Sequence, residues 1–354
     1  MIGCGSGTQE GRFGDVRFPA EQAEPVSRDG ACLTTVGRFR QELTKREEFA
    51  VEPAQRSPAL TSTHEARLAR ELSKKNLTFA IEQHHPDMTY MLILLAVALA
   101  VSSIGWKYFI YFFSTGYGFS IAALAITIAI IFSGALTAPT ILLCLTMFLF
   151  GCRLGGYLLY RQRKATAYKK ILYSPELQKK KPLKAILLVW IFCAILYAAQ
   201  VSPIAFRLAN QTKGIPVSDI WAWTGAIIML AGVALEAAAD AQKNASKKKD
   251  PKRFVSTGLY AIVRCPNYLG EIIIWTGALI SAFGAGLNIW QWIIVLIGYA
   301  GIMYVMFSGA RRLELRQIET YGQDPQFQAY VRKTPILLPL IPLYSVAKHE
   351  WLQA

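Results

Sequence analysis

The chain has 354 residues, of which 53% are hydrophobic and 17% are charged, and its formal net charge is +15. Soluble domains carry about 25% charged residues, so this composition argues against an ordinary cytosolic protein. It also excludes a disordered chain, a coiled coil and a disulfide-stapled secreted domain. The charge is uneven, because residues 1–87 hold 12 basic and 13 acidic side chains whereas residues 88–354 hold 26 and 10.

Residues 1–87 form a polar leader that differs from the membrane domain expected at 88–354. The leader is rich in Gly, Pro and Glu and has no signal-peptide core. We expect it either to be disordered or to come from an upstream start site. Residues 2–7 resemble the glycine loop of a nucleotide-binding domain, but such a loop follows a strand and opens a helix. No strand can precede residue 2 here, so we expect no site in the leader.

Residues 88–354 contain charge-free runs that are too long for a soluble core. The run at 108–152 has 45 residues and the run at 272–310 has 39. A helix needs about 20 apolar residues to cross a bilayer, so each run is long enough for two spans. The sequence therefore predicts an all-α, polytopic membrane helix bundle of about seven transmembrane spans. The expected ranges are 88–106, 117–133, 139–160, 185–206, 220–240, 269–285 and 288–310.

Basic residues gather where the third, fifth and seventh predicted spans end. These clusters lie at 161–184, 243–264 and 311–333, whereas the loops at 133–139 and 284–288 carry no charge. Cytoplasmic loops hold the excess of Lys and Arg, so we expect the three clusters in the cytoplasm and no nucleic-acid partner. An odd number of spans then places the leader on the other side, unless the first apolar run is re-entrant or interfacial.

Cysteine and histidine positions indicate no metal site. The six cysteines have no CxxC spacing, and the four histidines lie outside the predicted spans. We therefore expect neither a disulfide framework nor a buried metal centre.

Ionisable residues inside membrane segments are costly and are candidates for a functional site. Arg153 lies about two thirds along the third predicted span, and Tyr157 and Arg161 follow at i+4 and i+8 on the same helix face. Arg161 alone also fits a side chain that snorkels to the interface. Glu236 and Asp240 end the fifth span at i and i+4, and Asp240 alone also fits a hydrated helix end. Like charges on one face repel, so we expect a cation or hydroxyl groups to meet this pair.

The densest polar group lies at residues 257–271. Arg264 stands two residues before Pro266, which favours a helix start near Asn267. Helix N-termini bind anions, so Arg264 and this N-terminus predict a phosphate site at the cytoplasmic surface. Asn267 and Glu271 share a helix face and are candidates for holding ribose or amide groups. The C-terminal tail is too polar to span, and we expect it to pack against the cytoplasmic ends of the spans.

Several of these residues form motifs that belong together. The chain carries Glu236…Asp240, Thr257-Gly258-Leu259-Tyr260, Arg264, Pro266-Asn267-Tyr268-Leu269-Gly270-Glu271, Tyr330…Arg332-Lys333-Thr334-Pro335, and Gly151-Cys152-Arg153-Leu154 with Arg161. These motifs resemble the C-terminal domain of the steroid 5-alpha-reductase family, and most closely its bacterial branch of uncharacterised membrane proteins. The resemblance covers residues 117–342 and none of the leader.

The resemblance implies an oxidoreductase of a bacterial inner membrane whose cofactor site faces the cytoplasm. Such an enzyme uses NADPH to reduce an enone-type double bond in a lipid or steroid-like substrate that enters from the membrane lipids. The catalytic candidates are Tyr117, Tyr157 and Glu271, with a tyrosine as the proton donor. The cofactor-binding candidates are Arg153, Glu236, Asp240, Arg253, Tyr260, Arg264, Asn267, Tyr268, Glu271, Arg312 and Arg332.

The sequence also departs from the family pattern, which leaves alternatives open. Cys265 stands where many bacterial relatives have histidine, although steroid reductases lack that histidine too. Residues 112–119 carry no counterpart of the family's acidic residue for substrate. One alternative is a membrane methyltransferase of the isoprenylcysteine or phospholipid type using S-adenosylmethionine, although these usually lack equivalents of Asn267 and Glu271. The other is a non-catalytic lipid-binding or transport protein, but transporters usually show repeated halves and this sequence shows none.

Overall fold

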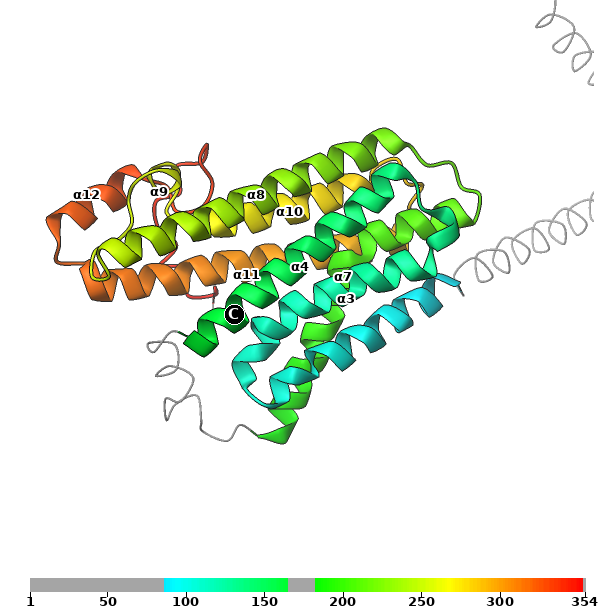
Figure 1. The fold of residues 1–354 in the computed structure, drawn as a ribbon, viewed down its shortest axis with the longest axis horizontal. Coiled ribbons are helices and arrows are strands. Elements are labelled where there is room, and N and C mark those ends of the chain that lie inside the picture. The colour runs from blue at the N-terminus through cyan, green and yellow to red at the C-terminus, as the bar shows by residue number, and fades with distance from the viewer. Residues whose placement is uncertain (1–85, 165–181, 353–354) are drawn as a thin grey trace, which may run out of the picture. The chain divides into compact units, whose positions relative to one another are not determined.

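The computed structural model describes residues 86–164 and 182–352 (Figure 1). The chain divides into two units, Met1–Lys75 and Asn76–Ala354. The first unit lies outside the described residues, as do the rest of the leader up to residue 85 and the basic segment 165–181. Within the described ranges every regular element is a helix. The all-α prediction is therefore confirmed for this part of the chain.

Successive long helices run in alternating directions through one bundle. The first is the apolar helix Pro86–Trp106, and its last turn is the 3-10 helix η1 (Ser103–Trp106). The other elements are η2 (Phe109–Phe113), α3 (Thr115–Ile131), η3 (Ser133–Ala135), α4 (Ala138–Lys164), α7 (Leu183–Thr212), α8 (Asp219–Lys249), α9 (Leu259–Ile262), α10 (Pro266–Ala282), α11 (Ile289–Tyr321) and α12 (Pro325–Lys333). Figure 1 shows α9 and α12 together at one end of the bundle, which we call the α12 end.

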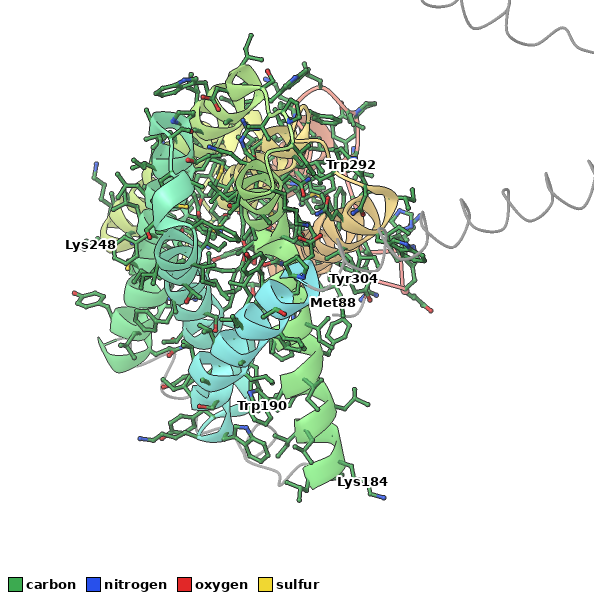
Figure 2. All side chains as sticks on the ribbon, turned by 90° about the vertical axis from the view of Figure 1, so that its right-hand side faces the viewer. Met88, Lys184, Trp190, Lys248, Trp292 and Tyr304 are labelled. Atoms are coloured by element: carbon green, nitrogen blue, oxygen red, sulfur yellow. The ribbon has the colours of Figure 1, made fainter. Side chains whose placement is uncertain are left out.

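Among residues 86–164 and 182–352, five helices are long and apolar enough to cross a membrane, namely Pro86–Trp106, α4, α7, α8 and α11. Helices α3 and α10 have 17 residues each, or about 25 Å of helix, which is shorter than a hydrocarbon core of about 30 Å. The predicted count of seven spans is thus not confirmed, although a helix overlaps each predicted range. Large apolar side chains such as Leu188, Ile227 and Leu296 are exposed on the long helices, and side chains stand out all round the bundle in Figure 2. These outer faces suit contact with lipid.

A polar network that the sequence did not single out lies at the end of the bundle opposite the α12 end. The ammonium of Lys213 is 2.6 Å from Asp87 Oδ1, and Gln291 Nε2 donates to Asp87 Oδ2 at 3.0 Å. Arg207 is fully buried, and its Nη2 is 3.1 Å from Asp219 Oδ1. These bonds fasten the start of the first helix to the end of α7 and the start of α11, and they join α7 to α8.

Helices α8 and α10 pack backbone against backbone through glycines. A Cβ atom built on Gly277 would lie 2.6 Å from the carbonyl oxygen of Gly225, and one on Gly232 would lie 2.7 Å from that of Gly270. A Cβ atom on Gly151 of α4 would likewise crowd the backbone of α3. Small residues let membrane helices approach this closely, so these pairs fix the spacing of α8 with α10 and of α3 with α4.

Replacing Gly277 by valine is therefore expected to destabilise the α8–α10 pair. The added methyl groups would overlap the Gly225 carbonyl and the Met229 side chain, and overpacking of this kind costs about 1–3 kcal/mol. Thermal unfolding of the detergent-purified variant measures the loss. Gly156 of α4, where an added Cβ atom meets nothing within 4 Å, is the matched control. An equal loss in Gly156→Val would contradict the packing argument.

The C-terminal tail folds back onto the bundle, as expected. Phe327 of α12 packs edge-on against Phe254 with 5.2 Å between ring centroids. Residues 334–352 then pass the start of α10, where the N–H groups of Arg264 and Cys265 each donate to a tail carbonyl at 2.9 Å. The tail is thus part of the structure that surrounds the start of α10.

Candidate functional site

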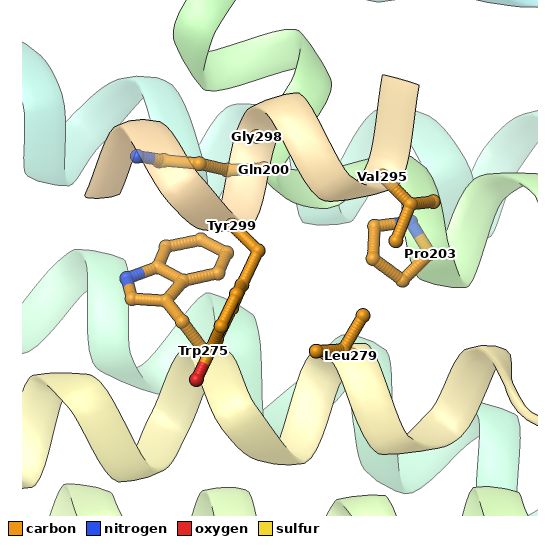
Figure 3. Close-up of a pocket in the computed structure, with 7 residues that line it drawn as sticks. All are labelled: Gln200, Pro203, Trp275, Leu279, Val295, Gly298 and Tyr299. Atoms are coloured by element: carbon orange, nitrogen blue, oxygen red, sulfur yellow. The ribbon is translucent and has the colours of Figure 1, made fainter. Parts of the chain in front are cut away.

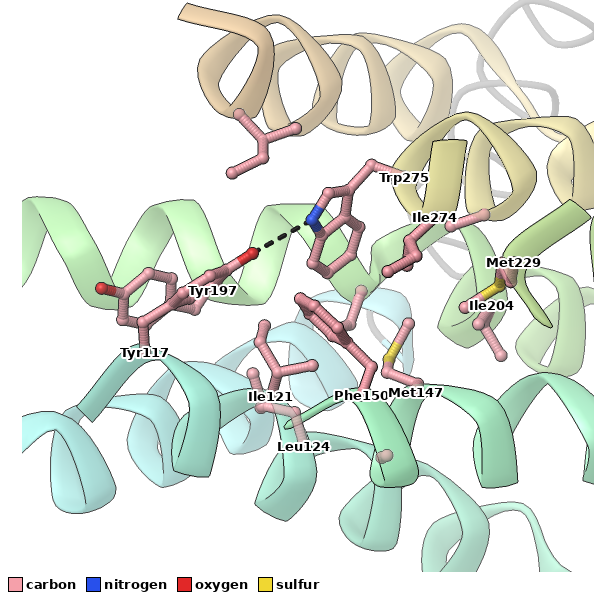
Figure 4. Packing of buried hydrophobic residues seen from close by; sticks show 14 of the residues in the cluster. Tyr117, Ile121, Leu124, Met147, Phe150, Tyr197, Ile204, Met229, Ile274 and Trp275 are labelled. Atoms are coloured by element: carbon pink, nitrogen blue, oxygen red, sulfur yellow. Dashed lines mark hydrogen bonds between the residues drawn. The ribbon is translucent and has the colours of Figure 1, made fainter. Parts of the chain in front are cut away.

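Polar side chains meet in the apolar interior between α3 and α10. The hydroxyl of Tyr117 on α3 donates to Glu271 Oε1 on α10 at 2.6 Å. The indole N–H of Trp275, one turn further along α10, donates to the same Tyr117 oxygen at 3.0 Å (Figure 4). All three side chains are buried, and Phe150 packs edge-on against both rings. Tyr117 and Glu271, which the resemblance named for separate reasons, are thus in direct contact.

A second charged group joins α4 to α8. Arg153 Nη1 is 3.1 Å from Asp240 Oδ2, and Arg153 Nη2 contacts Glu236 Oε1. The expectation that a cation meets the Glu236–Asp240 pair is therefore confirmed. Glu236 Oε2 has no hydrogen-bond partner among the described residues. Since Glu236 and Glu271 lie on facing turns of α8 and α10, Arg153 offsets negative charge in a region that holds three carboxyl groups.

Helix α4 continues this polar face towards the α12 end. The hydroxyl of Tyr157 donates to Asn244 Oδ1 on α8 at 3.2 Å. The guanidinium of Arg161 lies over the Tyr157 ring, 5.5 Å from its centroid, which is a cation–π arrangement. The prediction that Arg153, Tyr157 and Arg161 share one helix face is thus confirmed. Tyr157 bonds a neutral amide whereas Tyr117 bonds a carboxylate, so Tyr117 is the better placed of the two to exchange a proton.

The turn before α10 is held between α8 and α12. Gly258 has a φ of 62°, which glycine adopts without strain. The hydroxyl of Tyr260 donates to the carbonyl oxygen of Ala239 at 3.3 Å, and that of Tyr330 donates to the carbonyl oxygen of Tyr260 at 2.6 Å. Burial raises the pKa of both phenols, so they stay neutral. Tyr260 therefore holds the turn against α8 and α12.

The first turn of α10 carries one unpaired polar atom. Asn267 Oδ1 is buried and has no hydrogen-bond partner in the part of the chain that is described. The ring of Tyr268 packs beside Gly309 of α11. Burial raises the pKa of the Cys265 thiol to about 12, so this residue is a neutral thiol at physiological pH. Asn267 is thus the member of this turn with a free acceptor for a ligand.

Arg264 is not at the surface, where the sequence placed it. Its side chain and that of Glu314 are each 1% exposed, and Arg264 Nη2 is 2.8 Å from Glu314 Oε1. The same nitrogen donates to the carbonyl oxygen of Tyr344, and the N–H of Val346 donates to Glu314 Oε2 at 2.8 Å. Arg264 is therefore not the expected surface ligand for phosphate. With Glu314 it joins the start of α10 to α11 and the tail, an arrangement that we call the Arg264 clamp. Arg264 Nε and Nη1, which have no partner within 86–164 and 182–352, are the atoms left for a ligand.

The three other arginines predicted to bind the cofactor are exposed. Arg253 Nη2 donates to Gln326 Oε1 at 3.1 Å. Arg312 lies on α11 and Arg332 on α12, two elements that reach the α12 end (Figure 1). Their guanidinium groups are accessible to an anion that approaches this end of the bundle.

A family model described as "Protein of unknown function (DUF1295)" matches residues 109–334, which is more than half of the chain. The chain belongs to the DUF1295 family. No curated protein and no solved structure matches the sequence. All the predicted site residues, from Tyr117 to Arg332, lie inside the DUF1295 match, whereas Tyr344 and Val346 of the Arg264 clamp lie beyond it.

Three residues of this site, and Gln200 in a neighbouring cavity, are not predicted from the sequence. Asn244 follows Asp240 at i+4, and this spacing was a usable signal. Glu314 was hidden among the many charges of the tail. Trp275 lies in an apolar run, where its sequence context is that of any lipid-facing aromatic residue. Gln200 is a lone amide in the apolar run of α7.

Proposed function

We propose that this chain is an integral membrane oxidoreductase that uses NADPH to reduce an enone-type double bond in a lipid-soluble substrate. The observation that carries the proposal is the buried Tyr117–Glu271 pair, in which a phenol that can donate a proton rests on a carboxyl group that can return one. A positioned acid of this kind fits general acid catalysis. The surrounding apolar helices suit a lipid substrate, and the resemblance to the steroid 5-alpha-reductase family supports the same activity.

The residues of the chain would perform the proton-transfer half of the reaction. Bound NADPH would supply a hydride to the β-carbon of the enone. The Tyr117 hydroxyl would turn from Glu271 to the substrate carbonyl, polarise it and donate its proton to the oxygen. The Trp275 N–H would stabilise the charge left on the Tyr117 oxygen, and protonated Glu271 would return a proton to it. The enol then tautomerises, so one hydride and one proton have been added across the double bond.

The residues near the α12 end suit a dinucleotide. Amide and carboxylate oxygens suit ribose and carboxamide groups, and guanidinium groups suit phosphates. Buried atoms without a hydrogen-bond partner among the described residues include Asn267 Oδ1, Glu236 Oε2, and Nε and Nη1 of Arg264. Exposed cations at this end include Arg253, Arg312 and Arg332. The excess of basic residues at this end supports a cytoplasmic orientation, on the side where a bacterial cell holds NADPH.

NADPH is expected to raise the unfolding temperature of the detergent-purified, full-length chain. A ligand that binds only the folded state stabilises it by about 2.7 kcal/mol at 100 times its Kd, so micromolar binding is visible. We expect the double variant Arg312→Gln/Arg332→Gln to lose most of the shift, because two phosphate ligands are removed without disturbing the core. Lys348→Gln, an exposed change in the tail, should keep it.

NADH and S-adenosylmethionine, each added alone, separate the candidate functions. A shift with S-adenosylmethionine alone would replace the reductase by a membrane methyltransferase. No shift with any of the three compounds would favour a non-catalytic lipid-binding protein.

A further inference from the structure

A small cavity lies between α7, α10 and α11. Its walls include Gln200 and Pro203 of α7, Trp275 and Leu279 of α10, and Tyr299 of α11 (Figure 3). It has room for about one water-sized group. Leu279 and Tyr299 are partly exposed whereas Gln200, Pro203 and Trp275 are buried. The cavity is therefore closed on the inside, and its outer wall faces the surroundings of the bundle between α10 and α11.

Gln200 brings an unsatisfied polar group to this cavity. Its side chain is 2% exposed, and neither amide atom has a hydrogen-bond partner among the described residues. A buried amide left unpaired is unfavourable and requires an explanation. The proline one turn on does not supply it. Pro203 deprives the Ala199 carbonyl of its helical donor, but the Ser202 hydroxyl replaces that donor at 2.7 Å.

We propose that Gln200 binds a hydroxyl or carbonyl oxygen of a lipid-soluble ligand that enters from the bilayer between Leu279 and Tyr299. A primary amide can donate to a carbonyl and accept from a hydroxyl. An oxygen atom is close to a water in size, so the cavity would take the polar group while the apolar body remains between α10 and α11. The ligand class is thus an apolar molecule that carries an oxygen, not a plain hydrocarbon.

The cavity also shares a wall with the candidate active site. The ring of Trp275 lines it, while the N–H of the same indole donates to Tyr117 at 3.0 Å. The indole ring of Trp275 would therefore separate an oxygen bound at Gln200 from the Tyr117–Glu271 pair. If the ligand is the substrate, which rests on the proposed function, it must carry a second oxygen besides the carbonyl that Tyr117 would protonate. Binding at Gln200 does not itself depend on the reaction.

Photolabelling of the full-length, detergent-purified chain tests this site. We would compare three diazirine probes of equal length: a long-chain alcohol, the matching ketone and the matching hydrocarbon. The alcohol and the ketone are expected to label peptides of α10 and α11 about tenfold more than the hydrocarbon, since loss of one buried hydrogen bond changes affinity by about that factor. In Gln200→Leu their labelling should fall to the hydrocarbon level. The unfolding temperature should stay equal or rise, because an unpaired amide is replaced by a residue of similar volume.

Matched variants separate the anchor from the entrance. Gln211→Leu makes the same change on α7 at an amide that already donates to the Ala135 carbonyl at 2.9 Å, and it should keep the labelling pattern. Leu279→Trp narrows the outer wall and should reduce labelling by all three probes. Leu296→Trp, on the exposed face of α11, should not.

Two outcomes would overturn the site. Equal labelling by the hydrocarbon would show that no oxygen is recognised. Unchanged labelling in Gln200→Leu together with a lower unfolding temperature would assign the amide to a structural water. The NADPH experiment is independent. If labelling depends on Gln200 but NADPH does not shift the unfolding temperature, the lipid site is kept and the reductase is rejected. If NADPH shifts the unfolding temperature but labelling does not depend on Gln200, the reductase is kept and the lipid site is rejected.

Discussion

Replacing Arg264 by methionine is expected to lower the free energy of unfolding by about 3–5 kcal/mol, because removing one partner of a buried ion pair leaves the other charge uncompensated. The stranded charge would be Glu314, which is 1% exposed. The tail would also lose the Arg264 bond to the Tyr344 carbonyl. Thermal unfolding measures the loss, and limited proteolysis should show earlier cleavage in residues 334–352.

A second substitution tests the cause. Adding Glu314→Gln to Arg264→Met removes the stranded charge and should restore part of the stability. The exposed Arg316 is the control, and Arg316→Met should change stability by less than about 0.5 kcal/mol. If the unfolding temperature of Arg264→Met is no lower than that of Arg316→Met, the Arg264 clamp does not stabilise the fold. The same comparison is needed to interpret ligand binding. If an Arg264 variant no longer binds NADPH, loss of the folded structure must be excluded before the result is assigned to a lost phosphate contact.

Replacing Tyr117 by phenylalanine is expected to reduce turnover of an enone substrate by a factor of about 10²–10⁴, the usual contribution of a positioned acid. The NADPH-induced shift in unfolding temperature should remain, because the hydroxyl is assigned to the substrate carbonyl. Single-turnover oxidation of NADPH, followed by absorbance, measures the chemical step.

Tyr197 supplies a matched control for that experiment. Its ring lies 5.1 Å from that of Tyr117 between centroids, and it is equally buried, but its hydroxyl donates to the backbone carbonyl of Phe112. Tyr197→Phe removes a buried hydroxyl without touching Glu271, so its effect on turnover should be small. Similar losses in both variants would assign Tyr117 to packing and remove the support for proton transfer.

The helices could be predicted from the sequence because each is encoded locally. Charge-free runs mark the apolar helices, and Pro266 marks the start of α10, where it occupies the first helical position. The spacing of Arg153, Tyr157 and Arg161 likewise fixes one helix face. The number of spans depends on helix length relative to bilayer thickness. Helices α3 and α10 have 17 residues each, as many as their predicted ranges, but this is fewer than the roughly 20 residues that a span needs.

The contacts of the site could not be derived in the same way. Tyr117 and Glu271 are 154 residues apart, and no local pattern states that α3 packs on α10. The sequence predicts an exposed Arg264 because its partner Glu314 stands 50 residues later among many other charges. The predicted span at 185–206 stops before Arg207, whereas Asp219 and nearby carbonyls allow α7 to continue past this residue with its guanidinium buried.

The glycine contacts described above have a consequence for how the protein assembles in the membrane. The helices joined through glycine, α3 with α4 and α8 with α10, are close neighbours in the chain, so each pair can associate as soon as both of its helices have been inserted. The earlier pair carries Arg153, whose ionic partners Glu236 and Asp240 lie on α8 of the later pair. Unpaired charges are unfavourable in lipid, so the ion pairs between α4 and α8 favour association of the two helix pairs. Residues of the candidate site would therefore also direct the assembly of the bundle.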